Sequence, residues 1–237
     1  MAGAGSGKCN GFTYRCAAAW DRPPLSHPLS LQQQMNAQYP SKNKGQASDH
    51  PAVTAMSAKQ ALRRHFRAQR RLDQTATRSI QDAVMELIGR SNCGNRHVGI
   101  YWPLSGEADL RPLRDGHHPP LALPVADGNG GLIYRCWSQE PLEPDGCGIP
   151  APAKGDALQA DQLALLLVPA LAVDGVGIRL GYGGGYYDRL RADPAWAAVP
   201  AWVVLPSACI AAEPLPREPW DLPFTGWITE QGAGRPA

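Results

Sequence analysis

The chain has 237 residues, and 43% of them are hydrophobic, which suffices for one domain with a packed core. Its formal net charge is +2, but residues 1–55 hold five basic and two acidic side chains, so the rest of the chain is close to neutral. A near-neutral body argues against a nucleic-acid-binding protein, and no apolar run approaches the roughly 20 residues that span a bilayer. We therefore expect a protein whose partners include neither nucleic acid nor a membrane.

Residues 1–55 show little hydrophobic periodicity, and we expect them to be disordered or a non-native extension, with translation starting at Met56. The opening Gly-Ser-Gly-Lys-Cys is not a phosphate loop, because that motif needs glycine at Ala2 and serine or threonine at Cys9. The six cysteines form no C-x-x-C pair. We expect them to be reduced thiols, which favours a cytoplasmic protein.

Two helices are predicted at the start of the folded part. The first begins at Ser57, a plausible N-cap, and carries apolar side chains on one face and basic ones on another, namely Lys59, Arg63, Arg67 and Arg70. The second begins near Thr77 and repeats apolar residues at helical spacing, namely Ile80, Ala83, Val84, Leu87 and Ile88.

Short β-rich runs follow and alternate with helical stretches. We predict strands over residues 98–101, 121–125, 132–137, 163–168, 202–205 and 225–229. The run 163–168 is apolar throughout, which favours a central strand covered on both faces. The alternation predicts an α/β fold in which one domain, residues 56–230, has a largely parallel central sheet flanked by helices in Rossmann-like or NagB-like layering. Residues 231–237 are expected to form a tail.

The densest signal follows the predicted strand that ends at Pro169. After Arg179, four glycines occur within five residues, at Gly181 and at residues 183–185. Glycines let the backbone come close to a ligand, and a series of their N–H groups can form an anion-binding concavity. Arg179 would add a fixed positive charge. The pattern therefore predicts a phosphate site.

The residues after the glycines fit this interpretation. A helix predicted from Tyr186 would attract phosphate at its N-terminus, and Asp188 offers an oxygen ligand suited to magnesium. A dinucleotide-binding fingerprint would need glycine at Tyr186, so that interpretation fails. A flexible linker without a ligand is the remaining alternative, although such linkers are typically rich in glycine and serine and lack this combination of arginine, tyrosines and aspartate.

The ten residues from Arg179 to Asp188 resemble the signature of the 5-formyltetrahydrofolate cyclo-ligase family, also called methenyltetrahydrofolate synthetases. That signature is Arg-Leu-Gly-x-Gly-x-Gly-Tyr-Tyr-Asp after a strand ending in proline, and the chain matches it at every fixed position. The resemblance extends over roughly residues 57–230. It implies an enzyme that uses ATP and a magnesium ion to cyclise 5-formyltetrahydrofolate to 5,10-methenyltetrahydrofolate, with release of ADP and phosphate.

Weaker segments extend the resemblance in the expected order. Lys59 and Arg63 stand where the family has a Lys-x-x-x-Arg that contacts ATP, although alone they would be a solvated basic face. Residues 101–107, Tyr-Trp-Pro-Leu-Ser-Gly-Glu, resemble the segment that holds the folate. Asp221, within Trp-Asp-Leu-Pro, resembles an aspartate that assists magnesium, although alone it would be a turn residue.

Three positions depart from the family pattern. The glutamate of a Glu-Pro pair is Ala151, a common phenylalanine is Val173, and the usual glutamine after Cys209 is Ile210. These departures bear on folate affinity more than on phosphate binding. They motivate an alternative, a folate- or nucleotide-binding homologue without catalysis and with a regulatory role. Another N-formyl acceptor is a further alternative.

In the mechanism that the resemblance implies, the formyl oxygen attacks the γ-phosphate of ATP, and N10 of the same folate then displaces phosphate. Both nucleophiles belong to the substrate, so the protein supplies position and charge. The implied ATP-binding residues are Lys59, Arg63, Arg179, Leu180, Gly181, Gly183, Gly184, Gly185 and Tyr187. The implied folate-binding residues are Trp102, Glu107, Tyr182 and Tyr186, and the implied magnesium ligands are Asp188 and Asp221. The implied catalytic residues are Lys59, Arg179 and Tyr186, and the enzyme is expected to be a monomer.

Overall fold

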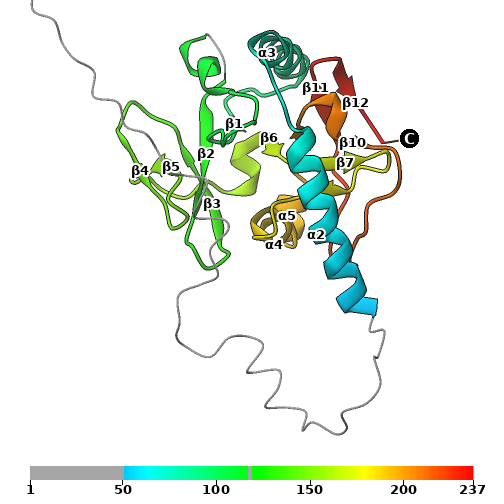
Figure 1. The fold of residues 1–237 in the computed structure, drawn as a ribbon. Helices are drawn as coiled ribbons and strands as arrows, with labels where there is room; N and C mark the ends of the chain where they lie inside the picture. The colour runs from blue at the N-terminus through cyan, green and yellow to red at the C-terminus, as the bar shows by residue number, and fades with distance from the viewer. Residues whose placement is uncertain (1–50, 117–118, 237) are drawn as a thin grey trace, which may run out of the picture. The chain divides into compact units, whose positions relative to one another are not determined.

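A computed structural model describes residues 51–116 and 119–236 of the chain (Figure 1). The helices are α2 (Pro51–Gln69), α3 (Gln74–Arg90), α4 (Tyr186–Arg191) and α5 (Pro194–Ala197), with short 3-10 turns at η1 (Arg111–Asp115), η2 (Ala160–Gln162) and η3 (Ser207–Cys209). Most of the expected extension, residues 1–50, lies outside the described residues.

Seven strands form the main sheet. In spatial order they are β12 (Gly232–Gly234), β11 (Gly226–Thr229), β9 (Ala201–Val204), β6 (Leu163–Pro169), β1 (His97–Gly99), β2 (Leu121–Ala126) and β3 (Leu132–Cys136). The five inner strands run parallel, and the two edge strands, β12 and β3, pair antiparallel to their neighbours. The predicted α/β class with a largely parallel sheet is therefore confirmed.

Two smaller sheets lie beside the main one. β4 (Leu142–Pro144) and β5 (Pro150–Pro152) form an antiparallel hairpin. β7 (Ala172–Asp174) pairs antiparallel with β8 (Arg179–Leu180) and parallel with β10 (Ile210–Ala211). The β7–β8 pair matters for the site, because it fixes the residues that enter the glycine loop.

Hydrophobic side chains cover both faces of the main sheet. Phe66 of α2 packs on one face together with Leu166 and Val168 of β6. Ile80 of α3 packs on the other face together with Leu165 and other residues of β6. All seven residues of β6 are buried, which confirms the prediction of a central strand covered on both sides.

The order of the strands in the main sheet indicates where a ligand would bind. β2 and β6 lie on opposite sides of β1. Along the chain, β2 is added on one side of β1, and β6 and β9 are later added on the other side. In open α/β sheets, ligands bind outside the carboxyl ends of the strands at such a reversal of strand order. The residues that follow β1 and β6 are therefore the expected place for a ligand.

Several predicted boundaries were wrong. α2 begins at Pro51, so Ser57 lies inside the helix and is not its N-cap. α3 begins at Gln74 instead of near Thr77, because the Asp73 carboxylate accepts a hydrogen bond from the Ala76 N–H at 2.7 Å and caps the helix. Part of the expected tail, residues 231–237, forms β12, which pairs with β11.

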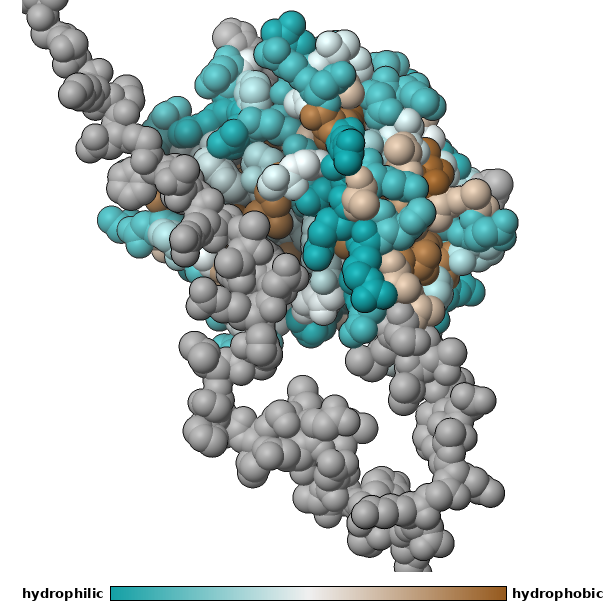
Figure 2. All heavy atoms as spheres, in the orientation of Figure 1, coloured by the Kyte–Doolittle hydropathy of each residue, from teal (hydrophilic) through white to brown (hydrophobic). Residues whose placement is uncertain are grey.

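The visible surface carries both hydrophilic and hydrophobic side chains. Figure 2 shows hydrophilic side chains along α2, with smaller hydrophobic areas on both sides of it. Among the described helices, none combines the length and the apolar character that crossing a bilayer requires. The four described cysteines, Cys93, Cys136, Cys147 and Cys209, are free thiols.

Candidate functional site

The glycine loop, residues 181–185, connects β8 to α4. Gly183 and Gly185 adopt positive φ angles of 108° and 67°, and Gly185 is the N-cap of α4. Side chains other than glycine rarely adopt this conformation. The two glycines therefore allow a tight turn that other residues would strain.

Arg179 joins this loop to the carboxyl end of the central strand. Its Nη1 donates a hydrogen bond to the Pro169 carbonyl at 3.1 Å, and its Nη2 to the Asp188 carboxylate at 3.3 Å. The guanidinium lies over the Tyr187 ring, at 5.2 Å from the centroid. A Cβ at Gly181 would lie 2.9 Å from the Arg179 nitrogens, so a larger residue there would displace the guanidinium. The loop thus begins with a buried cation at the end of β6.

α2 contributes two more cations, one of which contacts the glycine loop. Arg63 donates from Nε to the Gly181 carbonyl at 3.0 Å, and Lys59, one turn earlier, forms an ion pair with Asp221 at 2.8 Å. Burial lowers the pKa of Arg63, and the nearby Asp188 carboxylate opposes this effect. Arg63 and Arg179, which come from two distant segments, therefore meet at the glycine loop, whereas Lys59 contacts Asp221.

The two expected magnesium ligands are each paired with a cation. Asp188 has a side chain 33% exposed and faces Arg179, whereas Asp221 faces Lys59 and also accepts a hydrogen bond from the Glu218 N–H at 2.8 Å. In the described part of the chain, no three His, Cys, Asp or Glu side chains converge as a ready-made metal centre. Two carboxylates nevertheless fit magnesium, which proteins often bind through one or two carboxylates together with substrate phosphates.

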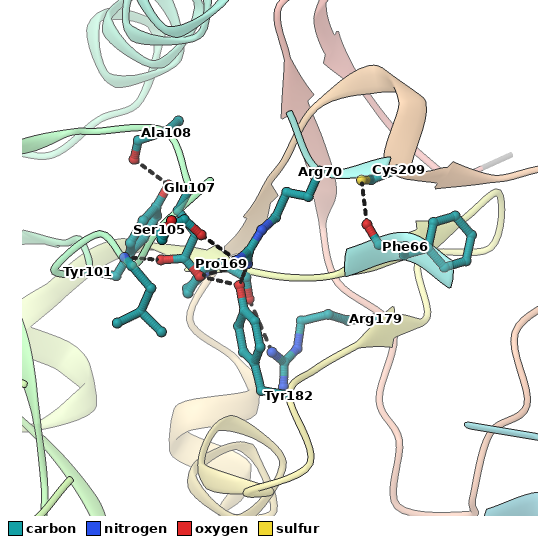
Figure 3. Close-up of polar contacts among 11 residues, drawn as sticks. Phe66, Arg70, Tyr101, Ser105, Glu107, Ala108, Pro169, Arg179, Tyr182 and Cys209 are labelled. Atoms are coloured by element: carbon teal, nitrogen blue, oxygen red, sulfur yellow. Dashed lines mark hydrogen bonds and ion pairs between the residues drawn. The ribbon is translucent and has the colours of Figure 1, made fainter. Parts of the chain in front are cut away.

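The folate side of the expected site is a buried polar cluster (Figure 3). Glu107 accepts a hydrogen bond from the Leu104 N–H at 2.7 Å and another from the Tyr182 hydroxyl. It also forms an ion pair with the Arg70 guanidinium at 3.5 Å. The side chain of Glu107 is 3% exposed, and burial raises its pKa, while the Leu104 N–H, Tyr182 and Arg70 oppose the rise. Glu107 and Tyr182, predicted from separate segments, are thus in direct contact.

Arg70 was not among the predicted site residues. It follows α2 directly, and Figure 3 shows its guanidinium pointing between Glu107 and Tyr182. The sequence placed it on the basic face of the helix, where a solvated arginine is the usual outcome. Its spacing of seven residues from Arg63 and eleven from Lys59 puts the three on one helical face, which is the signal that could have identified it.

The remaining predicted aromatic residues have other neighbours. Trp102 packs edge-on against Trp137, with ring centroids 6.1 Å apart, and lies under the Arg111 guanidinium. The Tyr186 hydroxyl lies 2.9 Å from Cys147 Sγ, and burial raises the pKa of Tyr186 above its usual value. Burial also raises the pKa of Tyr187, to about 12.

Two of the three departures from the family pattern are neighbours in the structure. Val173 of β7 and Ile210 of β10 are register partners in a parallel pair, and Val173 is fully buried. Ala151 is buried in β5, opposite Glu143 of β4. Val173 and Ala151 therefore pack inside small sheets.

The chain is similar to known proteins of one family. The model of the 5-formyltetrahydrofolate cyclo-ligase family matches residues 55–230. The 5-formyltetrahydrofolate cyclo-ligase of Escherichia coli K12 is 32% identical over 142 residues, which cover 56% of this chain and 76% of the relative. The enzyme of the same name from Haemophilus influenzae is 29% identical over 160 residues, 63% of this chain and 82% of the relative.

Two solved structures are similar as well. The 5,10-methenyltetrahydrofolate synthetase of Aquifex aeolicus superposes with a TM-score of 0.63 at 30% identity, covering 75% of this chain and 92% of that one. The 5,10-methenyltetrahydrofolate synthetase of Mycoplasma pneumoniae gives a TM-score of 0.57 at 17% identity, covering 73% and 98%, and at this identity shows a shared fold.

Proposed function

We infer that this chain, which belongs to the 5-formyltetrahydrofolate cyclo-ligase family, is a ligase that uses ATP to convert 5-formyltetrahydrofolate to 5,10-methenyltetrahydrofolate. One observation carries the assignment to this site. Tyr182 lies inside the glycine loop, and its hydroxyl contacts the buried Glu107. A polyphosphate on the loop and a folate on Glu107 would therefore be adjacent, as a transfer between them requires.

On the phosphate side, Lys59, Arg63 and Arg179 would neutralise the triphosphate of ATP. Their present partners support this role, because Arg63 is bonded to the Gly181 carbonyl and Arg179 is held beside Tyr187 at the start of the loop. The N–H groups of residues 181–185 would cradle the phosphate oxygens. Leu180 is buried in β8 and anchors the loop to β7.

Magnesium, when bound, would neutralise charge on the phosphates, and Asp188 and Asp221 are the residues that would hold it. The donor chemistry fits, because carboxylate oxygens are the ligands that magnesium prefers. Arg179 and Lys59, which now pair with these carboxylates, would then be available to the phosphates. Lys59 and Arg179 are therefore proposed as catalytic groups that contact the reacting phosphate.

On the folate side, Glu107 would accept hydrogen bonds from N–H donors of the pterin, and Trp102 offers a flat apolar surface for the aromatic part of the substrate. Tyr182 and Tyr186 would face the folate from the glycine loop and the first turn of α4. The hydroxyl of Tyr186, bonded to the Cys147 thiol, would help to position the reacting formyl group.

The reaction balances without a protein nucleophile. The formyl oxygen attacks the γ-phosphorus and ADP leaves with the electrons of the broken bond. N10 then attacks the activated formyl carbon, inorganic phosphate leaves, and N10 loses its proton to give the methenyl cation. The proposed phosphate-binding and folate-binding residues contribute orientation and charge stabilisation, which dominate catalysis of phosphoryl transfer.

The test is an absorbance assay for the methenyl product with purified protein, 5-formyltetrahydrofolate and magnesium, with and without ATP. Product that depends on ATP is expected. Binding of both substrates without product would instead support the non-catalytic homologue, which the Ala151, Val173 and Ile210 departures motivate. A panel of other N-formyl compounds would identify a different acceptor if folate gave no turnover.

We further propose that the enzyme works as a monomer in the cytoplasm. The free thiols of Cys93, Cys136, Cys147 and Cys209 support a reducing compartment. Light scattering coupled to size-exclusion chromatography would measure the mass, and an active dimer alone would contradict the monomer.

A further inference from the structure

The most unusual feature outside the predicted site residues is the arginine that follows α2. Arg70 has a side chain only 9% exposed, although it carries a permanent charge and could reach solvent. Its backbone N–H donates to the Phe66 carbonyl at 2.9 Å, which continues the last turn of the helix and directs the side chain inward. Burying a charge costs free energy unless it is paired and hydrogen-bonded. The position therefore needs an explanation in terms of partners.

The Arg70 guanidinium binds groups from two separate loops. It donates to the Ser105 carbonyl and contacts Glu107, both in the loop after β1, and it donates to the Tyr182 hydroxyl in the glycine loop. It also lies over the Tyr182 ring, 5.2 Å from the centroid. A rigid fork of donors can hold two partners in a fixed relation, which a lysine cannot do.

The loop after β1 is shaped around this arginine. A Cβ at Gly106 would lie 3.1 Å from Arg70 Nε and 3.2 Å from its carbonyl oxygen, and Gly106 has a φ of +80°. Glycine thus lets the loop pack against the guanidinium while Ser105 and Glu107, on either side, reach it. The loop after β1 therefore fits closely around the Arg70 guanidinium.

Arg70 also opposes protonation of Glu107. The groups around that carboxylate are Arg70 from the end of α2, Tyr101 and the Leu104 N–H from the β1 loop, and the tyrosines Tyr182 and Tyr187. Arg70 is the positively charged side chain that lowers the pKa of Glu107. Burial alone raises the pKa of Glu107, so without the guanidinium this carboxyl group would bind a proton more readily.

We propose that Arg70 is a positioning residue for the reaction, which orients Glu107 and Tyr182 as one unit for the folate. This inference rests on the proposed function, since it assumes that Glu107 accepts hydrogen bonds from the pterin. It assigns to Arg70 a role on the folate side, whereas Lys59 and Arg63 of the same helical face serve the phosphates. α2 then serves both substrates from one face.

The test measures the Kd of 5-formyltetrahydrofolate by titration calorimetry, without ATP, for the wild type, Arg70→Met and Arg70→Lys. Arg70→Met is expected to weaken binding by roughly 10- to 100-fold, the scale of one hydrogen bond to a charged group. The methionine keeps the apolar bulk of the stem, and Arg71→Met, at the exposed neighbouring position, is the matched control.

The pH dependence separates positioning from general damage. Removing Arg70 raises the pKa of Glu107 further, so as the pH falls, folate binding by Arg70→Met should begin to weaken at a higher pH than wild-type binding does. Arg70→Lys keeps a charge and should follow the wild-type pH profile, but should bind folate several-fold more weakly because the fork is lost. The Kd of ATP should change little in either variant.

Three results would overturn the proposal. These are an unchanged folate Kd in Arg70→Met, an equal loss of ATP and folate affinity, or a pH profile like that of the wild type. If Arg70→Met does not fold, Arg70→Lys decides, because an unchanged folate Kd there would remove the need for the fork. A wild type that binds folate but forms no methenyl product would refute the catalytic function while leaving the binding test of Arg70 valid.

Discussion

Replacing Arg179 by alanine tests the phosphate site most directly. The side chain is 5% exposed and has two separable roles, one in the fold and one in the proposed reaction. The Pro169 carbonyl would lose a hydrogen bond from a charged donor, worth about 1.5–3 kcal/mol. The Tyr187 and Phe224 rings would lose a cation, about 0.5–1 kcal/mol each. The partly exposed ion pair with Asp188 adds about 0–1 kcal/mol.

The expected loss of stability is therefore about 2–4 kcal/mol, allowing for incomplete additivity. The expected loss in kcat/KM is separate and also about 2–4 kcal/mol, or roughly 30- to 900-fold, the scale of one preorganised charge contact. Steady-state kinetics at a temperature well below the melting transition would measure the second effect apart from the first.

Arg135→Ala is the matched control, because Arg135 donates to two backbone carbonyls, at Pro152 and Ala153, and has no assigned contact with a substrate. It should lower stability and leave kcat/KM unchanged. Near-normal turnover by Arg179→Ala would refute the reasoning. An equal loss of turnover in both variants would show that the effect is structural.

Three further predictions concern the loop, the metal and the thiol. Gly183→Ala should raise the KM of ATP, because alanine at φ 108° carries about 1–2 kcal/mol of backbone strain. Its Cβ would lie at an ordinary 3.6 Å from Arg63, so no clash adds to the strain. Gly175→Ala, whose Cβ would meet nothing within 4 Å, is the control and should leave this KM unchanged. Chelation should abolish turnover and added magnesium restore it, with Asp221→Asn needing more of the metal; activity indifferent to chelation would contradict the metal site. Cys147→Ala should lower stability by about 0.5–1.5 kcal/mol through the lost bond to Tyr186, whereas Cys147→Ser should keep most of it; equal melting temperatures would exclude this contact.

Long, strongly patterned elements could be predicted from the sequence. β6 was identified because it is apolar throughout, and α3 because its apolar residues recur at helical spacing. The short strands β4, β5 and β10 were not predicted. They contain two or three residues each and exist through pairing with distant segments, for instance Ile210 with Val173, which local pattern does not encode.

The site divides along the same line. The residues from Arg179 to Asp188 could be predicted because one contiguous motif carries them. The contact of Tyr182 with Glu107 joins positions 75 apart in the chain, and that with Arg70 joins positions 112 apart. Arg70 was placed only on the basic face of a predicted helix, because the sequence shows its charge and its periodicity but not the two loops that fold over it.

Contacts from three other segments support the glycine loop, so its motif depends on the rest of the fold. Arg63 binds it from α2, Glu107 from the loop after β1, and Arg189 links α4 to the β2–β3 turn by donating to the Gly130 carbonyl at 2.9 Å. Grafting the ten-residue signature onto another scaffold would transfer the glycines without these braces. A transplanted loop would have to be redesigned together with its supports before it could recognise a nucleotide.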